Sequence, residues 1–506
     1  MHWLSRLFKD VFKDQTQAKV CAAALAVVFI AVRLLNLPTF CLDSDEVFSI
    51  TVAGQPWSGL FYDVGHDIVH PPLFYIVLKL WIAIGGTGFL WLRLLPALFS
   101  ILSLIPFFGL CSALRLRLWQ TNVALALLCF NVDQIFHSQY VRMYSLLFLL
   151  SLCSYWAFVK FLTAETRRWR PLLLLGIANV LLVYSHYYGW AVIASEGLYL
   201  LWIDRKRLAG FTSVTAIVAA CFTPWLLWAS HFAQIRGGLK ANIGWIPRPN
   251  PAHLLGYYTS LTVDPQPALA SLFWWTIAGA FFVLAAALLY FGLRKKARVR
   301  TALDHWRIPF LLTAAFVPPL ASFIFSQFAA ESVWGSRHLV ICAVPYFILI
   351  AIALEMIPVR QFRFAAAALV SAWAIVGTIH ILNPEIRVNY EVLAEQMVTR
   401  EPGPERLRLA ILDPNHFFPI GYHLNQHAPG RWDARRVKRI DDVYAIQDPH
   451  FWVAYHSECW KGEPLRQLLT ERGYRVGLGI WVSDPWHRII AYPVWRPNQL
   501  DALNQR

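Results

Sequence analysis

The stretch YSLLFLLSLCSYWAFVKFL at residues 144–162 decides the fold, because it carries no charge until Lys160. A run of about 20 apolar residues is long enough to cross the hydrocarbon core of a bilayer as a helix. Similar runs recur from residue 20 to residue 382. Over all 506 residues, 57% are hydrophobic and 15% are charged, whereas a soluble domain is about a quarter charged. The sequence therefore predicts a polytopic α-helical membrane protein with a smaller soluble part.

About eleven transmembrane helices are predicted from these runs. They cover residues 20–38, 93–113, 120–138, 144–162, 171–188, 190–203, 211–230, 269–291, 308–328, 338–357 and 364–382. Residues 1–19 are predicted to be a cytoplasmic segment, and residues 1–12 within it show the spacing of either a short interfacial helix or a flexible tail. Residues 383–506 are richer in charge and predict a separate soluble α/β domain.

In that domain, helices and strands are expected to alternate. Helices are predicted at 389–400, 419–424 and 463–472, and strands at 408–412, 451–455, 476–482 and 487–494. It contains no Gly-rich phosphate loop, so nucleotide binding there is not expected. Docking of an acceptor is one role that the sequence leaves open.

The loops between the spans fix the predicted orientation. Alternate loops are rich in Lys and Arg: 115–117, 167–170, 205–207, 294–300 and 360–363. Basic loops stay on the cytoplasmic side, which places the N-terminus inside and the C-terminal domain outside. Because the net charge of +15 is largely spread over these loops, it does not form a nucleic-acid-binding stripe.

Residues 71–90 test this topology, because they are apolar enough to span. Lys79 lies in the middle of the run, however, and glycines close it at 85, 86 and 88. A span here would turn every later basic loop outward, against the usual bias. We therefore expect this segment to lie along the outer membrane interface.

The first outer loop, about residues 39–92, carries a cluster of acidic and histidine side chains. Asp43, Asp45 and Glu46 follow the first span, and Asp63, His66, Asp67 and His70 come later. Acidic groups beside a membrane are costly unless they are solvated, paired or metal-bound, so such a cluster indicates a functional site. Asp45 and Glu46 are neighbours, so on a helix their side chains point in different directions.

Five further motifs are expected at the same outer face. They are HPPLFY (70–75), LRLLPALFS (92–100), QYVRMY (139–144), YSHYYG (184–189) and SRHL (336–339). In this combination, over residues 20–345, the chain resembles the GT-C glycosyltransferases, and in particular the bacterial protein O-mannosyltransferases and the aminoarabinose transferase of lipid A. It departs from them at His338, where the family more often has Tyr.

The resemblance implies a GT-C fold and a site on the outer face of a bacterial inner membrane. It implies inverting transfer of a sugar from a polyprenyl-phosphate donor to a lipid, glycan or protein acceptor. Asp45 is the implied catalytic base with Glu46 beside it, and Arg142, Arg337 and His70 are candidates to bind the donor phosphate. Some family members use a divalent metal cation, and Asp67 with His70 are its candidate ligands here.

Ring-bearing residues near these motifs are candidates for substrate binding. They are Tyr144, His186 and Tyr187, with Trp245, Tyr257 and Tyr258 in an outer loop at 232–268. Gly237 and Gly238 suggest that this loop is a lid. Plainer interpretations stay open: the arginines as interface anchors, His186 as a hydrogen-bonded residue between helices, His70 as a helix cap, and the loop as a simple connection.

Two alternatives complete the prediction. A transporter or flippase for a lipid-linked glycan would need ionisable groups within the spans and related halves, and no such repeat is evident. An oligosaccharide transferase or a polysaccharide ligase is the other enzymatic possibility. Cys41 and Cys459 are the only cysteines expected outside the membrane, so they are the only candidates for a disulfide.

Overall fold

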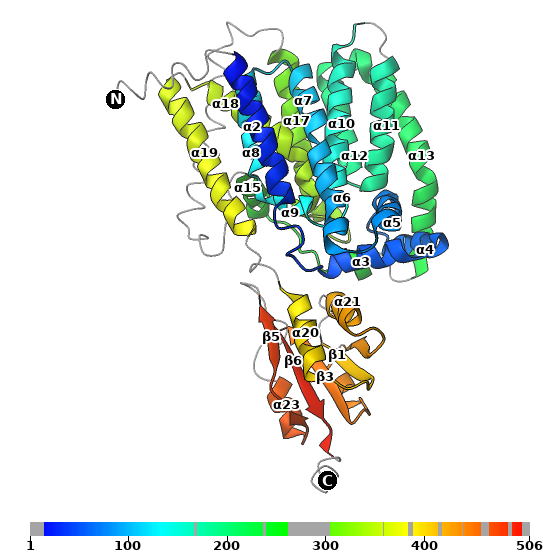
Figure 1. Cartoon of the computed structure of the whole chain (residues 1–506). Helices are drawn as coiled ribbons and strands as arrows, with labels where there is room; N and C mark the ends of the chain where they lie inside the picture. The colour runs from blue at the N-terminus through cyan, green and yellow to red at the C-terminus, as the bar shows by residue number, and fades with distance from the viewer. Residues whose placement is uncertain are drawn as a thin grey trace. The chain divides into compact units, whose positions relative to one another are not determined.

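The computed structural model describes residues 15–165, 169–235, 239–261, 304–357, 359–382, 388–412, 417–437, 439–456, 465–483 and 488–497. The predicted helix at 1–12, the predicted span at 269–291 and Cys459 lie outside these residues. The chain divides into two compact units (Figure 1). Unit 1 comprises Met1–Leu35, Val52–Gly86 and Trp91–Leu382, and unit 2 comprises Asn36–Thr51, Thr87–Leu90 and Asn383–Arg506.

Unit 1 is helical. Its longer helices are α2 (Gln15–Leu34), α6 (Phe89–Leu102), α7 (Leu104–Ala113), α8 (Leu118–Cys129), α10 (Tyr144–Thr163), α11 (Trp169–Ser185), α12 (Gly189–Ile203), α13 (Leu208–Ile235), α17 (Asp304–Phe328), α18 (Ala343–Glu355) and α19 (Arg360–Ile381). Short elements join them: α4 (Trp57–Asp67), α5 (Leu73–Gly85), α9 (Val132–Ser138), η1 (Arg205–Arg207), α14 (Leu239–Ile243), α15 (Pro251–Ser260) and η3 (Ser336–Cys342). Helix α3 (Ser44–Gly54) is shared between the two units.

Six helical stretches within the described ranges are long and apolar enough to cross a membrane. They are Thr16–Leu34, Phe89–Ala113, Tyr144–Thr163, Arg205–Phe232, His305–Phe328 and Ser336–Glu355. Four shorter apolar helices accompany them. A helical membrane protein is therefore indicated, as predicted, but the predicted number of about eleven spans is not confirmed.

The predicted single span at 120–138 is two helices, α8 and α9, with Asn131 between them. Asn131 caps α9: its Oδ1 accepts from the Gln134 backbone N–H at 3.0 Å, and its Nδ2 donates to the Leu261 carbonyl at 3.0 Å. Arg33 of α2 donates to the carbonyl oxygens of Leu128 and Cys129 at 2.8 and 2.7 Å. Because the last carbonyls of a helix have no partner within it, this buried arginine stabilises the break.

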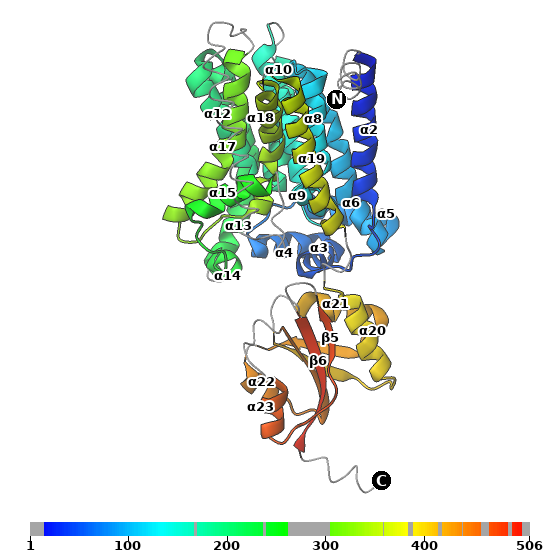
Figure 2. The ribbon, with the colours of Figure 1, turned by 90° about the vertical axis from the view of Figure 1, so that its left-hand side faces the viewer.

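Helices α4 and α5 are the short helices after the first span. With 13 residues, α5 is about 20 Å long, less than the roughly 30 Å of a hydrocarbon core. Figures 1 and 2 show α4 running across the ends of the long helices, where it packs on α13, while α5 packs on α11. Lys79 of α5 donates to the carbonyl oxygens of Ala53 and Gln55. Lys79, whose charge made a membrane span at 71–90 unfavourable, therefore binds the backbone at the end of α3.

Unit 2 contains a mixed six-stranded sheet with the order β2-β1-β3-β6-β4, and β5 also pairs with β6. Its strands are β1 (Leu407–Ile411), β2 (Trp432–Arg436), β3 (His450–His456), β4 (Arg475–Val476), β5 (Ile480–Ser483) and β6 (Arg488–Trp495). Strand β1 pairs in parallel with β2 and β3, whereas β6 pairs antiparallel with β3, β4 and β5. The helices are α20 (Tyr390–Arg400), α21 (Phe417–His427), α22 (Ile440–Tyr444) and α23 (Leu465–Glu471).

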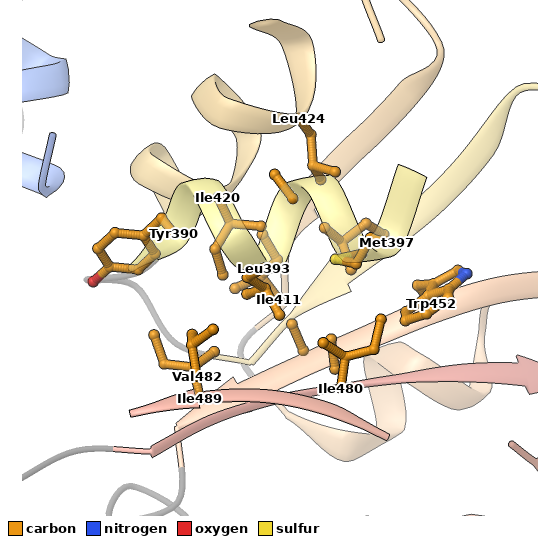
Figure 3. Close-up of a cluster of buried hydrophobic side chains, with 14 of the residues drawn as sticks. Tyr390, Leu393, Met397, Ile411, Ile420, Leu424, Trp452, Ile480, Val482 and Ile489 are labelled. Atoms are coloured by element: carbon orange, nitrogen blue, oxygen red, sulfur yellow. The ribbon is translucent and has the colours of Figure 1, made fainter. Parts of the chain in front are cut away.

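Alternation along the strands produces two cores in unit 2. Leu409 and Ile411 of β1 face α20 and α21 (Figure 3), and Ala410 lies in the second core with α22 and α23. The predicted helices of this region and the strands at 408–412, 451–455 and 487–494 are confirmed, whereas the predicted strand at 476–482 is two strands, β4 and β5; β2 and α22 were not predicted. Cys41, from the first outer loop, belongs to the first of these cores.

Candidate functional site: a cationic and histidine-rich cluster

A cluster of buried polar side chains forms where four connections of unit 1 meet. His70 lies between α4 and α5, Arg142 precedes α10, His186 lies between α11 and α12, and His338 lies in η3. All four are between 3% and 6% exposed. Four of the five sequence motifs that suggested an outer-face site supply this cluster: HPPLFY, QYVRMY, YSHYYG and SRHL.

Arg142 is held by two neighbours. Its Nη1 donates to the Tyr75 hydroxyl at 3.3 Å, and its Nη2 lies 3.4 and 3.5 Å from the two ring nitrogens of His70. Tyr75 is fully buried in the first turn of α5. A buried guanidinium fixed in this way presents a preorganised fork to an anion.

His70 is oriented in turn by Asp67. Its Nδ1 lies 3.0 Å from Asp67 Oδ2, and the Asp67 carbonyl accepts from Asn242 Nδ2 at 2.6 Å. The chain turns between them at Ile68, whose φ is 61°. In the part of the chain that the structure describes, no group of three or more His, Cys, Asp or Glu side chains is placed to hold a metal. Asp67 and His70, the suggested metal ligands, form a hydrogen-bonded pair.

His186 stands at the centre of the ring contacts. Its ring centroid lies 5.5 Å from that of His70, 4.7 Å from that of His338 and 6.4 Å from that of Tyr144. Its Nδ1 accepts from the Tyr188 backbone N–H at 3.1 Å, so the proton of the neutral ring lies on Nε2. Nε2 has no hydrogen-bond partner among the described residues.

The hydrogen bond to Nδ1 leaves Nε2–H as the donor edge of the His186 ring, and this nitrogen is buried. A neutral ring with a buried Nε2–H is suited to donate a hydrogen bond to an anion.

Arg337 lies at the more exposed side of this cluster. Its guanidinium is 5.7 Å from the ring centroid of Trp245, a cation–π contact. Trp245 is 68% exposed, and its Nε1 donates to the Asn242 carbonyl at 2.9 Å. Asn242 thus connects Trp245 with Asp67, which it also contacts.

Arg93, from the LRLLPALFS motif, has a supporting position. This fully buried arginine donates from Nη1 to the Gln139 carbonyl at 2.6 Å. Gln139 Nε2 in turn donates to the Leu35 carbonyl at 2.7 Å. These bonds fix the turn that presents Arg142.

The other predicted substrate-binding aromatics pack inside unit 1. The hydroxyl of Tyr257 donates to the Leu339 carbonyl at 2.7 Å, and that of Tyr258 donates to the Ala315 carbonyl at 3.1 Å. Both side chains are buried. Tyr187 accepts at its hydroxyl from Trp225 Nε1 at 3.2 Å. In the predicted lid loop, α13 extends to Ile235 and α14 and α15 follow; Gly237 and Gly238 lie outside the described residues.

The acidic segment belongs to unit 2, and its carboxylates differ in environment. Asp43 Oδ1 accepts from the backbone N–H groups of Asp45 and Glu46 at 3.0 and 3.2 Å, and Glu46 Oε2 accepts from the Asp43 N–H at 3.1 Å. This is a capping box at the start of α3. Glu46 is 1% exposed, whereas Asp45 is half-buried. Asp45 is therefore the more accessible member of the pair.

Sequence reasoning missed Tyr75, His137 and Tyr188 as members of the cluster. The ring of His137 lies 4.6 Å from that of Tyr144, and the ring of Tyr188 lies 4.9 Å from that of His338. Tyr75 and Tyr188 lie inside motifs that were identified, and His137 is two residues before QYVRMY. The sequence feature that these three residues share is a Tyr or His side chain within or directly before a motif at the end of an apolar run.

No family model matches the chain, and no curated protein matches it by sequence. Solved structures do match. The apo structure of ArnT from Cupriavidus metallidurans aligns with a TM-score of 0.57 at 13% identity, covering 94% of this chain and 97% of that chain. The same protein bound to undecaprenyl phosphate aligns with a TM-score of 0.54 at 12% identity, with the same coverages. The chain therefore shares the fold of ArnT.

Proposed function

We propose that this protein transfers a sugar from a polyprenyl-phosphate donor to an acceptor, with inversion, at the outer face of a bacterial inner membrane. The observation that carries the proposal is the buried guanidinium of Arg142, which is held by Tyr75 and by His70, whose ring packs edge-on against that of His186. Such a cluster suits a phosphate in a site that excludes water. The undecaprenyl phosphate in the ArnT complex supports a lipid phosphate as the ligand.

The reaction assigns a role to each group. The acceptor oxygen or nitrogen attacks the anomeric carbon from the side opposite the phosphate while the bond from that carbon to the phosphate oxygen breaks. The electron pair of the broken bond stays on the lipid phosphate, where Arg142, Arg337 and the His186 Nε2–H stabilise the new charge. The proton of the acceptor passes to the carboxylate of Asp45 as general base.

The remaining candidates have supporting roles in this proposal. Glu46 holds the first turn of α3, and His70 holds Arg142. Trp245 offers an exposed ring on which a sugar or a prenyl chain stacks. No residue is assigned to a metal, because Asp67 and His70 are used in the pair that positions Arg142.

One observation bears on the transporter alternative. Glu196 of α12 is fully buried within unit 1, as expected of an ionisable group on a transport path. Its Oε1 accepts from the Ser154 hydroxyl at 2.9 Å, and Ser154 also contacts Asn179 Oδ1 at 2.6 Å. These contacts join α10, α11 and α12, so Glu196 is used in helix packing. This favours the enzyme.

The test is incubation of the purified protein with a panel of polyprenyl-phosphate sugars and candidate acceptors. The expected result is release of free polyprenyl phosphate together with a glycosylated acceptor. The variant Asp45→Asn serves as the inactive control. If the intact donor moves across a vesicle membrane and its sugar is transferred to none of the acceptors in the panel, the transporter alternative would replace the proposal.

A further inference from the structure

The backbone directly before the acidic pair is built into the core of unit 2. Phe40, Cys41 and Leu42 are all buried. Cys41 Sγ donates to the Val388 carbonyl at 2.8 Å, and its side chain belongs to the hydrophobic cluster that α20 and α21 form with the sheet (Figure 3). A segment distant in sequence from residues 383–506 is therefore fixed by their fold.

One polar contact from unit 2 reaches the backbone at the start of α3. Nε2 of His423 in α21 lies 3.3 Å from the Leu42 carbonyl oxygen, with both residues buried. A carbonyl oxygen only accepts, so Nε2 of His423 carries the proton and donates. Tyr390 stacks on the ring at 6.4 Å and Phe89 packs edge-on at 5.7 Å, which fixes the direction of the N–H.

This contact lies on the residue directly before Asp43 and its capping box. Leu42 immediately precedes Asp43, whose Oδ1 binds the backbone N–H groups of Asp45 and Glu46. Any rotation of the peptide between Leu42 and Asp43 is therefore transmitted to the first turn of α3. The side chain of Asp45 projects from that turn.

We propose that His423 is a positioning residue for Asp45: by donating to the Leu42 carbonyl it fixes the first turn of α3, and through it the carboxylate. The importance of His423 for catalysis rests on the proposed function, whereas its role in holding the first turn of α3 does not. Unit 2 then supports the acidic segment, a role that differs from acceptor docking. Burial and His427 lower the pKa of His423 to about 4, which agrees with a neutral ring that donates from Nε2.

Three variants of the full-length protein test this role. His423→Leu removes the donor while filling part of the ring's space, and His423→Gln keeps an N–H donor at a reach similar to that of Nε2. Leu424→Ala, one residue along the same helix, removes buried core atoms and keeps the His423 donor, so it controls for loss of stability. Each variant is assayed for kcat, for the KM of the polyprenyl-phosphate sugar and for backbone hydrogen exchange at residues 42–47.

For His423→Leu we expect kcat to fall about tenfold with the donor KM within about twofold, because a small misplacement of a catalytic group lowers turnover strongly. Exchange at 42–47 is expected to accelerate. His423→Gln should restore kcat to within about threefold and slow the exchange, and Leu424→Ala should lower thermal stability without changing kcat.

Unchanged exchange at 42–47 in His423→Leu would overturn the inference, as would failure of the Gln variant to restore both readouts. The proposed function is judged separately with Asp45→Asn. If that variant stays active while His423→Leu still accelerates exchange, the assignment of Asp45 fails but the fixing of the segment by His423 stands.

Discussion

Nη2 of Arg142 lies 3.4 Å from Nδ1 and 3.5 Å from Nε2 of His70. Nearly equal distances to both ring nitrogens place the guanidinium nitrogen over the face of the imidazole. A guanidinium is planar and stacks on rings while its edge stays available for hydrogen bonds. One of those edge donors contacts Tyr75, so the position of Arg142 depends on its shape as well as its charge.

Arg142→Lys should therefore lower kcat/KM for the lipid-phosphate donor at least about tenfold, which corresponds to about 1.4 kcal/mol. Arg337→Lys should also weaken donor use, because it loses the two-nitrogen fork. The matched control is Arg248→Lys, since Arg248 donates to the carbonyl oxygens of Gln327 and Ala329 and is exposed. If both site variants stay within about twofold of wild type, the effect is below roughly 0.4 kcal/mol and the phosphate role is wrong.

Tyr75→Phe removes the hydroxyl that accepts from Arg142 and leaves the ring in place. Loss of one hydrogen bond to a charged group costs about 1.5–3 kcal/mol. We expect a fall of about tenfold or more in kcat/KM for the donor. Tyr258→Phe is the control, because that hydroxyl donates to the Ala315 carbonyl and its loss should change stability only. Equal kinetics for the two variants would show that Tyr75 does not support Arg142.

The acidic segment shows how far the sequence predicts the site. The spacing Asp-Ser-Asp-Glu from Asp43 to Glu46 matches a capping box as well as a pair of catalytic carboxylates. Local sequence identified the segment but did not separate the roles of its carboxylates. Burial makes the distinction within the pair, because Glu46 is 1% exposed in the capping box whereas Asp45 is half-buried.

Asp45→Asn should reduce transfer by at least about a hundredfold without unfolding the protein, since a general base contributes about 10²- to 10⁴-fold. The amide keeps the size of the side chain and removes the basic oxygen. Transfer rate and thermal midpoint are measured on the same preparation. Near-normal turnover in a folded variant would remove Asp45 from the mechanism.

Glu46→Ala should act mainly on stability. It leaves the Asp43 N–H without its carboxylate partner at a buried helix start, and loss of a cap costs about 0.5–2 kcal/mol. The thermal midpoint of the full-length protein is the measurement, with Glu395→Ala on the exposed face of α20 as the control. A loss of turnover with an unchanged midpoint would instead make Glu46 a direct participant in the reaction.

Two other features of the fold could not be predicted from the sequence, each for a physical reason. The break at Asn131 falls inside an apolar run. Its local bond to the Gln134 N–H caps α9, and its bond to the carbonyl of Leu261 comes from a segment distant in sequence. Strand β2 has the sequence WDARR, which lacks the alternation of a half-buried strand. Among the strands of the described residues it lies at the edge of the sheet, next to β1. Long apolar runs predicted the helices of unit 1 well, because their length and polarity can be recognised without knowing which other segment packs against them.

His423 also predicts a pH dependence of stability. Its pKa is lowered from 6.5 to about 4 in the folded protein, so between these values the unfolded chain binds a proton that the folded chain does not. The stabilisation is fully present above pH 6.5 and is lost as pH falls towards 4, by about 3 kcal/mol over the whole window. The thermal midpoint of wild type should fall more steeply from pH 7 to pH 4.5 than that of His423→Gln. Parallel curves would contradict a buried neutral histidine at this position.

The topology is open to a direct test. Helix α5 carries Lys79 in the middle of its apolar run, and this side chain binds the backbone at the end of α3. With α5 outside the count of spans, the positive-inside rule places Arg205, Lys206 and Arg207 in the cytoplasm and the C-terminus outside. An alkaline phosphatase fusion at residue 506 should be active, and a fluorescent protein that matures only in the cytoplasm should stay dark there.

Fusions at Lys206, between α12 and α13, provide the matched control and should show the opposite pattern. The side on which each later loop lies depends on the number of crossings before it, because one additional crossing between residues 71 and 90 reverses every later loop. It would also separate Asp45 from Arg142 and Arg337 by a hydrocarbon core about 30 Å thick, and no single reaction can use groups on both sides of it. An inactive phosphatase with a bright fluorescent fusion at residue 506, together with an active phosphatase and a dark fluorescent fusion at Lys206, would therefore remove the proposed mechanism together with the topology.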